Sequence, residues 1–148
     1  MDLVQPENNM EPRITMEDIW MQTAILLAQR SKCSKAQVGC VITTSDLRHV
    51  LGNGYNGYAS GIDYICTKER CDCLHAENNA VIDTGSKYKD KVFFVTMFPC
   101  LSCAIQIINS GCSKLYYHFP YRDGSKHWEK FPEVVKLLEK ANIQIIEL

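Results

Sequence analysis

The sequence has no large excess of charge of either sign and no long hydrophobic run. Its 16 lysines and arginines nearly balance 17 aspartates and glutamates, which leaves a net charge of -1. So small a charge gives no general attraction to nucleic acid or anionic lipid, and any phosphate must be held by a local group of residues. No apolar run reaches the roughly 18 residues that span a bilayer, and the first residues lack the basic and apolar segments of a secretion signal. We therefore expect a soluble, cytoplasmic protein with neither a membrane nor a nucleic acid as partner.

The composition is that of an ordinary globular domain. The chain has 148 residues, of which 46% are hydrophobic and 22% charged, and these values exclude a fibrous, collagen-like or wholly disordered protein. Residues 1–13 contain two prolines, several acids and no periodicity. We interpret them as a flexible leader before a single domain that spans residues 14–148.

Hydrophobic periodicity and turn residues predict alternating helices and strands. One helix begins after the N-cap residue Thr15, and three more are predicted at 75–84, 100–109 and 131–140. Strands are predicted at 38–43, 49–52, 92–97, 114–117 and 143–146, with a glycine-rich loop at 52–61. Strands that alternate with helices indicate an α/β domain of three layers.

The motifs HAE (residues 75–77) and PCLSC (residues 99–103) carry the candidate chemistry. Cys100 and Cys103 are three residues apart in the first turn of a predicted helix, where the helix dipole lowers the pKa of a thiol. His75 opens another predicted helix. Two such helix starts that face each other supply three ligands to zinc and leave its fourth tetrahedral position to water, as in catalytic zinc sites.

Glu77 lies two residues beyond His75, so its side chain can lie beside the zinc-bound water without binding the metal. Because zinc lowers the pKa of water, a carboxylate in this place is suited to shuttle protons. The pattern H-x-E…P-C-x-x-C is the known signature of zinc deaminases. The alternative is a closed zinc site that includes the C-x-x-C pair, with HAE an unrelated helix start, but it does not explain Glu77.

Four other cysteines form a second pattern, although eight cysteines without a secretion signal make disulfides the less favoured interpretation. Cys73 and His75 are two residues apart at a helix start and point to different sides, so they do not share a metal. A second metal is the simpler solution, while free or redox-active thiols are the alternative. Cys40 and Cys112 fit small apolar roles. The four cysteines are Cys33, Cys66, Cys71 and Cys73.

The chain from about residue 16 to residue 148 resembles the deoxycytidylate (dCMP) deaminases of the zinc-dependent cytidine deaminase superfamily. The resemblance rests on QRSK, QVGCVI, GNGYNG, LHAENNAV, FPCLSCA, INSG and the region of Tyr121. The catalytic motif fits many members of the superfamily. GYNG together with RSK narrows the resemblance to the dCMP deaminases. The resemblance implies a three-layer fold with a mixed five-stranded sheet, and a closed zinc site formed by the second group of cysteines.

The same resemblance implies hydrolysis of dCMP to dUMP and ammonia, which supplies dUMP for thymidylate synthesis. Water activated by zinc attacks C4 of cytosine, and Glu77 passes the proton to N3 and then to the departing amine. The resemblance assigns stacking on the base to Tyr121, a contact to the base to the backbone around Ala76, and binding of the sugar to Asn56. Residues of the neighbouring loops are candidates for the phosphate: Arg30, Ser31, Lys32, Arg122 and Lys126.

The resemblance also implies control and assembly. It predicts activation by dCTP with Mg²⁺ and inhibition by dTTP, through Gly54, Tyr55, Asn56 and Gly57, in a homohexamer. Some regulated members carry an aromatic residue and an arginine where this sequence has Asp83 and Ser86. Three alternatives remain open: a nucleoside deaminase, a tRNA or single-strand deaminase, and a zinc-stabilised module that binds a nucleotide without turning it over.

Overall fold

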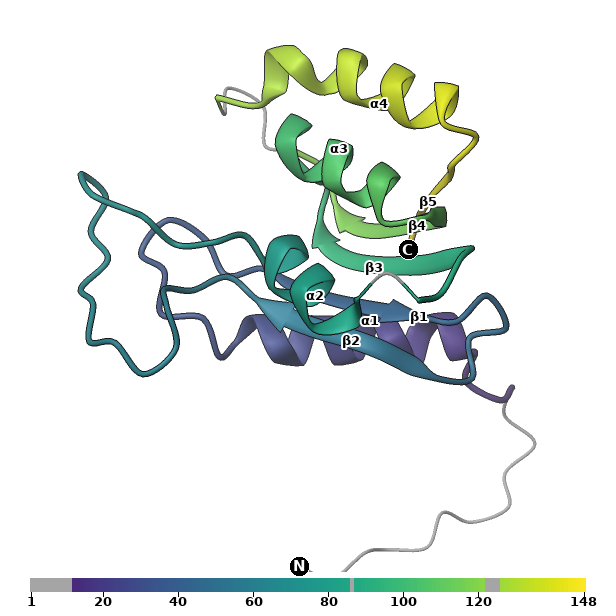
Figure 1. Cartoon of the computed structure of the whole chain (residues 1–148), viewed down its shortest axis with the longest axis horizontal. Helices are drawn as coiled ribbons and strands as arrows, with labels where there is room; N and C mark the ends of the chain where they lie inside the picture. The colour runs from purple at the N-terminus through teal and green to yellow at the C-terminus, as the bar shows by residue number, and fades with distance from the viewer. Residues whose placement is uncertain (1–11, 86, 122–125) are drawn as a thin grey trace, which may run out of the picture.

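A computed structural model describes residues 12–85, 87–121 and 126–148. Its centre is one five-stranded sheet in the order β2-β1-β3-β4-β5 (Figure 1). β1 pairs antiparallel with β2 and β3, while β3, β4 and β5 run parallel to one another, so the sheet is mixed as predicted. The strands are β1 (Gly39–Thr43), β2 (Val50–Tyr55), β3 (Lys91–Met97), β4 (Cys112–Phe119) and β5 (Gln144–Glu147).

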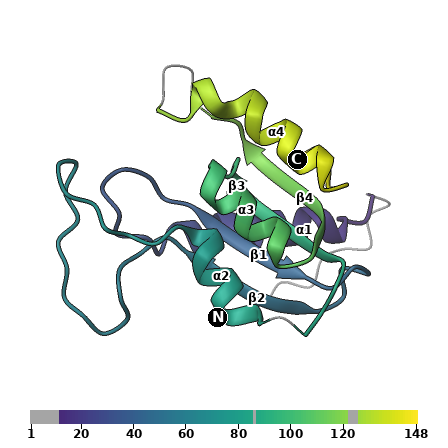
Figure 2. The same cartoon turned by 45° about the horizontal axis from the view of Figure 1, so that its top comes forward.

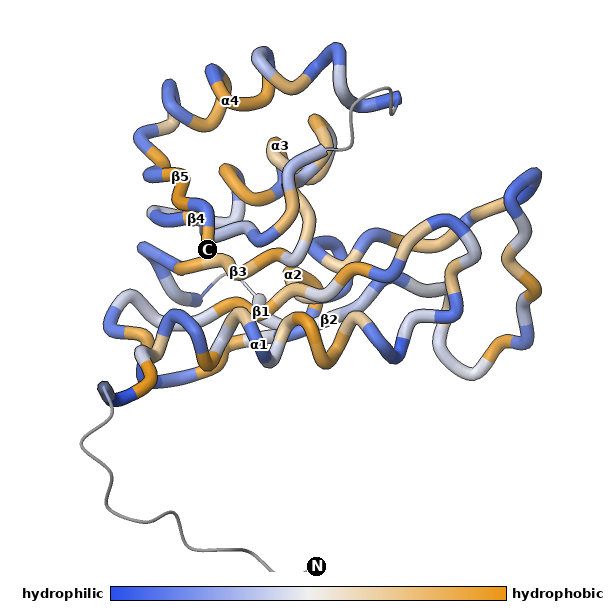
Figure 3. Tube along the Cα trace, turned by 180° about the vertical axis from the view of Figure 1, so that it is seen from behind, coloured by the Kyte–Doolittle hydropathy of each residue, from blue (hydrophilic) through white to orange (hydrophobic). Residues whose placement is uncertain are grey.

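Helices cover both faces of this sheet, which confirms the three-layer α/β fold. Alternate residues of the central strands enter different cores: Phe93 and Val95 pack with α2, α3 and α4, whereas Val92 and Phe94 pack with α1. Figures 1 and 2 both show α3 between α2 and α4. From the side of α1, Figure 3 shows hydrophobic and hydrophilic turns alternating along that helix. The helices are α1 (Met16–Ala28), α2 (Ala76–Thr84), α3 (Leu101–Asn109) and α4 (Phe131–Lys140), and a short 3-10 helix, η1 (Trp128–Lys130), precedes α4.

The predicted helix ends lie close to the observed ones. Thr15 caps α1, its hydroxyl accepting a hydrogen bond from the backbone N–H of Asp18 at 3.1 Å. α2 ends at Gly85, whose φ of 72° lies in the left-handed region that favours glycine. No helix in the described parts of the chain is both long and apolar enough to cross a membrane. Of the expected leader, residues 1–11 lie outside the described residues.

The glycine-rich loop is where the strand prediction was wrong. β2 continues to Tyr55, so the first four residues of the expected loop pair with β1. Their glycines leave room for α2, because a Cβ on Gly54 would lie 2.7 Å from the backbone nitrogen of Ala80 and one on Gly52 would lie 2.1 Å from Oγ1 of Thr84. The glycines of this strand are therefore explained by close helix packing.

Candidate active site

Three potential metal ligands meet where α2 and α3 begin. His75 is the N-cap residue of α2 and Cys100 that of α3, and Cys103 follows in the first turn of α3. Nδ1 of His75 lies 3.2 Å from Sγ of Cys103 and 3.5 Å from Sγ of Cys100. All three ligand atoms lie within 4.8 Å of one another. The two helix starts thus bring together residues that are 25 positions or more apart in the chain.

The spacing and charge of these atoms fit zinc. Bonds of about 2.3 Å to sulfur and about 2.0 Å to nitrogen place tetrahedral ligands roughly 3.5 to 3.8 Å apart. Hydrogen bonds from Cys103, His75 and Ser102 lower the pKa of Cys100 to about 3. The hydrogen bond to Cys100 and burial raise the pKa of Cys103. Since a cation between the two sulfurs stabilises both as thiolates, this donor set suits a zinc ion with one position left open.

Glu77 is buried in the first turn of α2, with 3% of its surface exposed. Burial raises the pKa of its carboxyl group, and the nearby His75 partly offsets this rise. Burying a carboxyl group that has no salt bridge among the described residues costs free energy of folding, so its presence here indicates a functional role. Its place beside three ligand atoms suits proton transfer at the metal.

The second group of cysteines also converges, and it joins the α1–β1 connection, which carries Cys33, to the long segment between β2 and α2, which carries the other three. Sγ of Cys33 lies 3.6 Å from Sγ of Cys71 and 3.8 Å from Sγ of Cys66, and Cys73 completes a set of four within 4.8 Å of one another. Hydrogen bonds from Ser34 lower the pKa of Cys66 to about 6. The sulfur spacings match those of tetrahedral zinc with four thiolates, so these residues could hold a closed zinc site.

We predict that Cys66→Ser lowers the melting temperature by about 5 °C or more and reduces bound zinc from two ions per chain to one. The reason is that a metal at this site ties the α1–β1 connection, which carries Cys33, to the β2–α2 connection, which carries Cys66 and Cys71. Elemental analysis and thermal unfolding measure both effects. Cys112→Ser is the matched control, because Cys112 belongs to neither group. A single zinc ion per chain in the wild-type protein would contradict the second site.

A cavity of about 760 Å³ opens beside the first group, within the usual size range of small-molecule sites. Phe98, Phe119 and Tyr121 form an aromatic part of its wall, and Glu77 is the one acidic residue among its described lining residues. Tyr121 is buried, donates its hydroxyl hydrogen bond to the carbonyl of Pro99, and meets Phe98 edge to face. The cavity is also lined by Ala76, Asn56, Lys126, His127, Lys35, Gln37 and the sulfur-bearing residues Cys33, Cys71 and Cys73.

The predicted sugar and phosphate residues lie in different places. Asn56 lines the cavity, but its amide already donates to the carbonyl of Ala36 at 2.7 Å and accepts from the N–H of Val38 at 2.9 Å. Ser31 is buried and donates to the carbonyl of Asn56 at 2.8 Å, so it braces the loop. Arg30 and Lys32 are exposed and are not among the lining residues, and Arg122 lies outside the described residues.

Sequence reasoning missed several side chains in the cavity wall: the aromatic Phe98 and Phe119 and the polar Lys35, Gln37 and His127. Lys35 lies three positions beyond Lys32 in the same loop, and no periodicity in that loop shows which lysine faces the cavity. His127 follows Lys126 and lies 5.7 Å from Tyr121 between ring centroids. The one sequence signal for Lys35 and His127 is that each is a polar residue within three positions of a predicted phosphate-binding residue.

The residues predicted to bind a regulator form the end of β2 and the turn after it. The backbone carbonyl of Tyr55 accepts a hydrogen bond from Asn79 of α2 at 2.9 Å. Gly57 exchanges two backbone hydrogen bonds with Leu74, next to His75, at 2.8 and 3.1 Å. A Cβ on Gly57 would meet no atom within 4 Å, whereas Gly54 is covered by α2. The turn is therefore linked to the start of α2.

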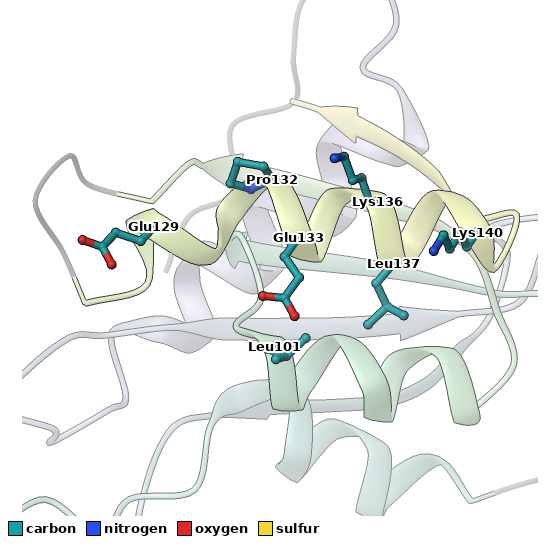
Figure 4. Close-up of a pocket in the computed structure, with 7 residues that line it drawn as sticks. All are labelled: Leu101, Glu129, Pro132, Glu133, Lys136, Leu137 and Lys140. Carbon is teal, nitrogen blue, oxygen red and sulfur yellow. The ribbon is translucent and has the colours of Figure 1, made fainter.

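A second hollow, of about 540 Å³, lies between α3 and α4 (Figure 4). Figure 4 shows Glu133 and Leu137 of α4 pointing toward α3, where Leu101 lies below them. Charged side chains of both signs line it, and none of the candidate metal ligands does. The first cavity is therefore the candidate active site.

Comparison with known proteins gives one family. The profile of the cytidine and deoxycytidylate deaminase zinc-binding region matches residues 15–119, which contain every candidate metal ligand. A deoxycytidylate deaminase of Schizosaccharomyces pombe is 30% identical over 161 residues, covering 97% of this chain and 46% of that protein. The deoxycytidylate deaminase of Mycobacterium phage D29 is 30% identical over 125 residues, covering 68% of this chain and 92% of that protein. The chain thus spans about half the length of the fission yeast protein but nearly all of the phage protein.

The fold also matches solved structures. The dCMP deaminase of cyanophage S-TIM5 superposes with a TM-score of 0.74 in its apo form, at 25% identity and with 90% of this chain and 97% of that chain covered. Its complex with dCMP and dUMP gives a TM-score of 0.76 at 24% identity, with 93% and 100% covered. These likenesses agree with the mixed five-stranded sheet and its flanking helices.

Proposed function

The chain belongs to the cytidine and deoxycytidylate deaminase family, and we propose that it hydrolyses dCMP to dUMP and ammonia, as its sequence motifs predict. Residues 14–148 form the catalytic domain. The observation that carries the proposal is the buried Glu77 beside His75, Cys100 and Cys103. A module that only bound a nucleotide would have no use for an unliganded carboxyl group next to the metal.

The reaction needs a nucleophile and a proton carrier. Bound zinc supplies Lewis acidity, which lowers the pKa of water to roughly 7 and provides a nucleophile at neutral pH. Glu77 accepts one proton of the attacking water and delivers it to N3 of cytosine. It then takes the second proton from the hydroxyl group formed on C4 and passes it to the amine, which leaves as ammonia while C4 becomes a carbonyl. Burial raises the pKa of Glu77, which eases the return of the proton. One carboxyl group therefore acts first as a base and then as an acid.

The cavity supports a nucleotide with a phosphate. Its aromatic wall at Phe98 and Tyr121 suits a flat base, and the backbone at Ala76 lies beside Glu77. Lys35 and Lys126 place positive charge on the lining, whereas the acid among the described lining residues is the buried Glu77. A monophosphate held between these lysines would leave the base near the metal ligands. Asn56, engaged by Ala36 and Val38, would shape the sugar pocket.

We predict that Lys35→Ala raises KM for dCMP about fivefold, because a charge-assisted contact to phosphate is lost. Its effect on deoxycytidine, which has no phosphate, should be small. Lys32→Ala is the matched control, since Lys32 is exposed in the same loop but does not line the cavity. Steady-state kinetics with both substrates measure the difference. Equal effects of the two substitutions on KM for dCMP would contradict a role of Lys35 in phosphate binding.

We also propose regulation by dCTP with Mg²⁺ as activator and by dTTP as inhibitor, in a homohexamer. Asn56 supports this, because its side chain holds the cavity wall while its backbone continues into the turn at Gly57. A shift of this turn would move the cavity wall. We expect a coupling free energy of about 1 to 3 kcal/mol between the binding of a regulator and the binding of dCMP. Initial rates at sub-saturating dCMP should rise with dCTP and Mg²⁺ and fall with dTTP. Rates that stay unchanged at saturating effector would contradict regulation, and light scattering tests the hexamer.

The substrate is tested by a panel of dCMP, deoxycytidine, cytidine and a cytosine-containing oligonucleotide. Loss of cytosine absorbance should be fastest with dCMP. Faster loss with a nucleoside would favour a nucleoside deaminase, and faster loss with the oligonucleotide would favour a polynucleotide substrate. No loss with any of them would contradict the proposed enzyme.

A further inference from the structure

Lys91 is a fully buried lysine at the start of β3, with none of its surface exposed. Its Nζ donates hydrogen bonds to the carbonyl of Gly85 at 3.0 Å and to the carbonyl of Ser110 at 2.7 Å. Its backbone N–H donates to the carbonyl of Gly111 at 3.0 Å. Gly85 is the C-cap residue of α2 and Ser110 that of α3. One side chain therefore joins the ends of two helices.

The charge of Lys91 has no acidic partner among the described residues, where the one salt bridge joins Arg70 and Asp72. A buried ammonium group needs compensation, because burial disfavours the charged form. The carbonyl groups at a helix C-terminus carry partial negative charge and are the natural partners of a cation. Lys91 thus draws together two helix ends that would otherwise repel each other.

The opposite ends of the same helices hold the candidate zinc ligands. α2 and α3 each have nine residues, so each is a rod of about 13.5 Å. His75 caps the start of α2, and Cys100 caps the start of α3. Near the ligands, Asn78 of α2 donates a hydrogen bond to Gln106 of α3. Lys91 and this bond fix the two rods to each other at two levels.

We propose that Lys91 is a positioning residue that sets the axial alignment of α2 and α3, and through it the spacing of His75 from Cys100 and Cys103. This inference rests on the proposed zinc centre. A slip of one helix along the other would change the distances from Nδ1 of His75 to the two sulfurs, which are now 3.5 and 3.2 Å. The four-cysteine group lies on loops and is not fixed by these helix ends.

The test compares zinc affinities in the full-length wild-type, Lys91→Met and Val134→Ala proteins. Lys91→Met keeps most of the aliphatic stem and removes both side-chain hydrogen bonds. Val134→Ala truncates a buried residue of α4 and controls for lost stability, since it leaves both side-chain hydrogen bonds of Lys91 in place. Zinc competition with a chromogenic chelator gives the affinity of each site, and Co²⁺ absorption distinguishes a two-thiolate from a four-thiolate site.

Lys91→Met should lower the zinc affinity of the two-thiolate site by about tenfold or more and change the Co²⁺ spectrum of that site. The four-thiolate site should keep its affinity, and Val134→Ala should keep both. Unchanged affinities in Lys91→Met, or equal losses in both variants, would overturn the proposal. If Lys91→Met does not fold, Lys91→Gln, which keeps an uncharged amide donor group but removes the ammonium charge, carries the same comparison. A wild-type protein that binds no metal at the two-thiolate site would instead overturn the proposed function.

Discussion

Replacing Glu77 by glutamine should lower the turnover number for dCMP by at least about 100-fold while both zinc ions stay bound. A positioned acid or base contributes roughly 10² to 10⁴-fold to such a reaction, and glutamine can neither accept nor return the proton. The substitution keeps the volume of a side chain that is 3% exposed, so packing around it should persist. Steady-state kinetics and elemental analysis of the same sample measure both quantities.

Asp83→Asn is the matched control, because it neutralises an exposed carboxyl group on the same helix. Its rate should remain close to that of the wild type. A Glu77→Gln protein that kept more than about a tenth of the wild-type rate would show that Glu77 does not carry the proton.

Cys103→Ser should remove one of two zinc ions and reduce the rate by more than about 10³-fold, because the activated nucleophile is lost. A serine hydroxyl stays protonated at neutral pH and is a far weaker zinc ligand than a thiolate. Cys103 is fully buried against His75 and Cys100, so water cannot easily take its place. Metal analysis and dCMP kinetics measure the loss.

Cys112→Ser serves again as the control, since Cys112 contacts neither group and its thiol donates to the carbonyl of Lys114. It should keep two zinc ions and full activity. A Cys103→Ser protein that retained both zinc ions and its activity would place the reaction elsewhere.

Local sequence signals predicted most of the fold because each has a short-range physical cause. Thr15 and Gly85 mark helix ends through capping and left-handed backbone, and both lie where expected. The apolar pattern of β3 was equally direct. The extension of β2 to Tyr55 was not predictable, because the glycines that usually mark a loop here accommodate α2, which begins only at Ala76.

In the candidate site, too, residues in short motifs could be predicted, whereas residues placed by tertiary structure could not. His75, Cys100 and Cys103 could be grouped from their motifs alone, because zinc chemistry restricts residue type and spacing. The choice between Lys32 and Lys35 depends on how an irregular loop turns, and no periodicity encodes it. Lys91 escaped notice because its partners are backbone carbonyls, which leave no mark in the sequence.

Hydrolytic deamination is tested by incubating the zinc-loaded protein with dCMP in water enriched in ¹⁸O. We expect dUMP with one ¹⁸O atom at C4 and one molecule of ammonia for each dCMP consumed. The Glu77→Gln protein should form neither product at a comparable rate. Recovery of unchanged dCMP from the wild-type reaction, with no ammonia released, would show that the protein does not deaminate dCMP.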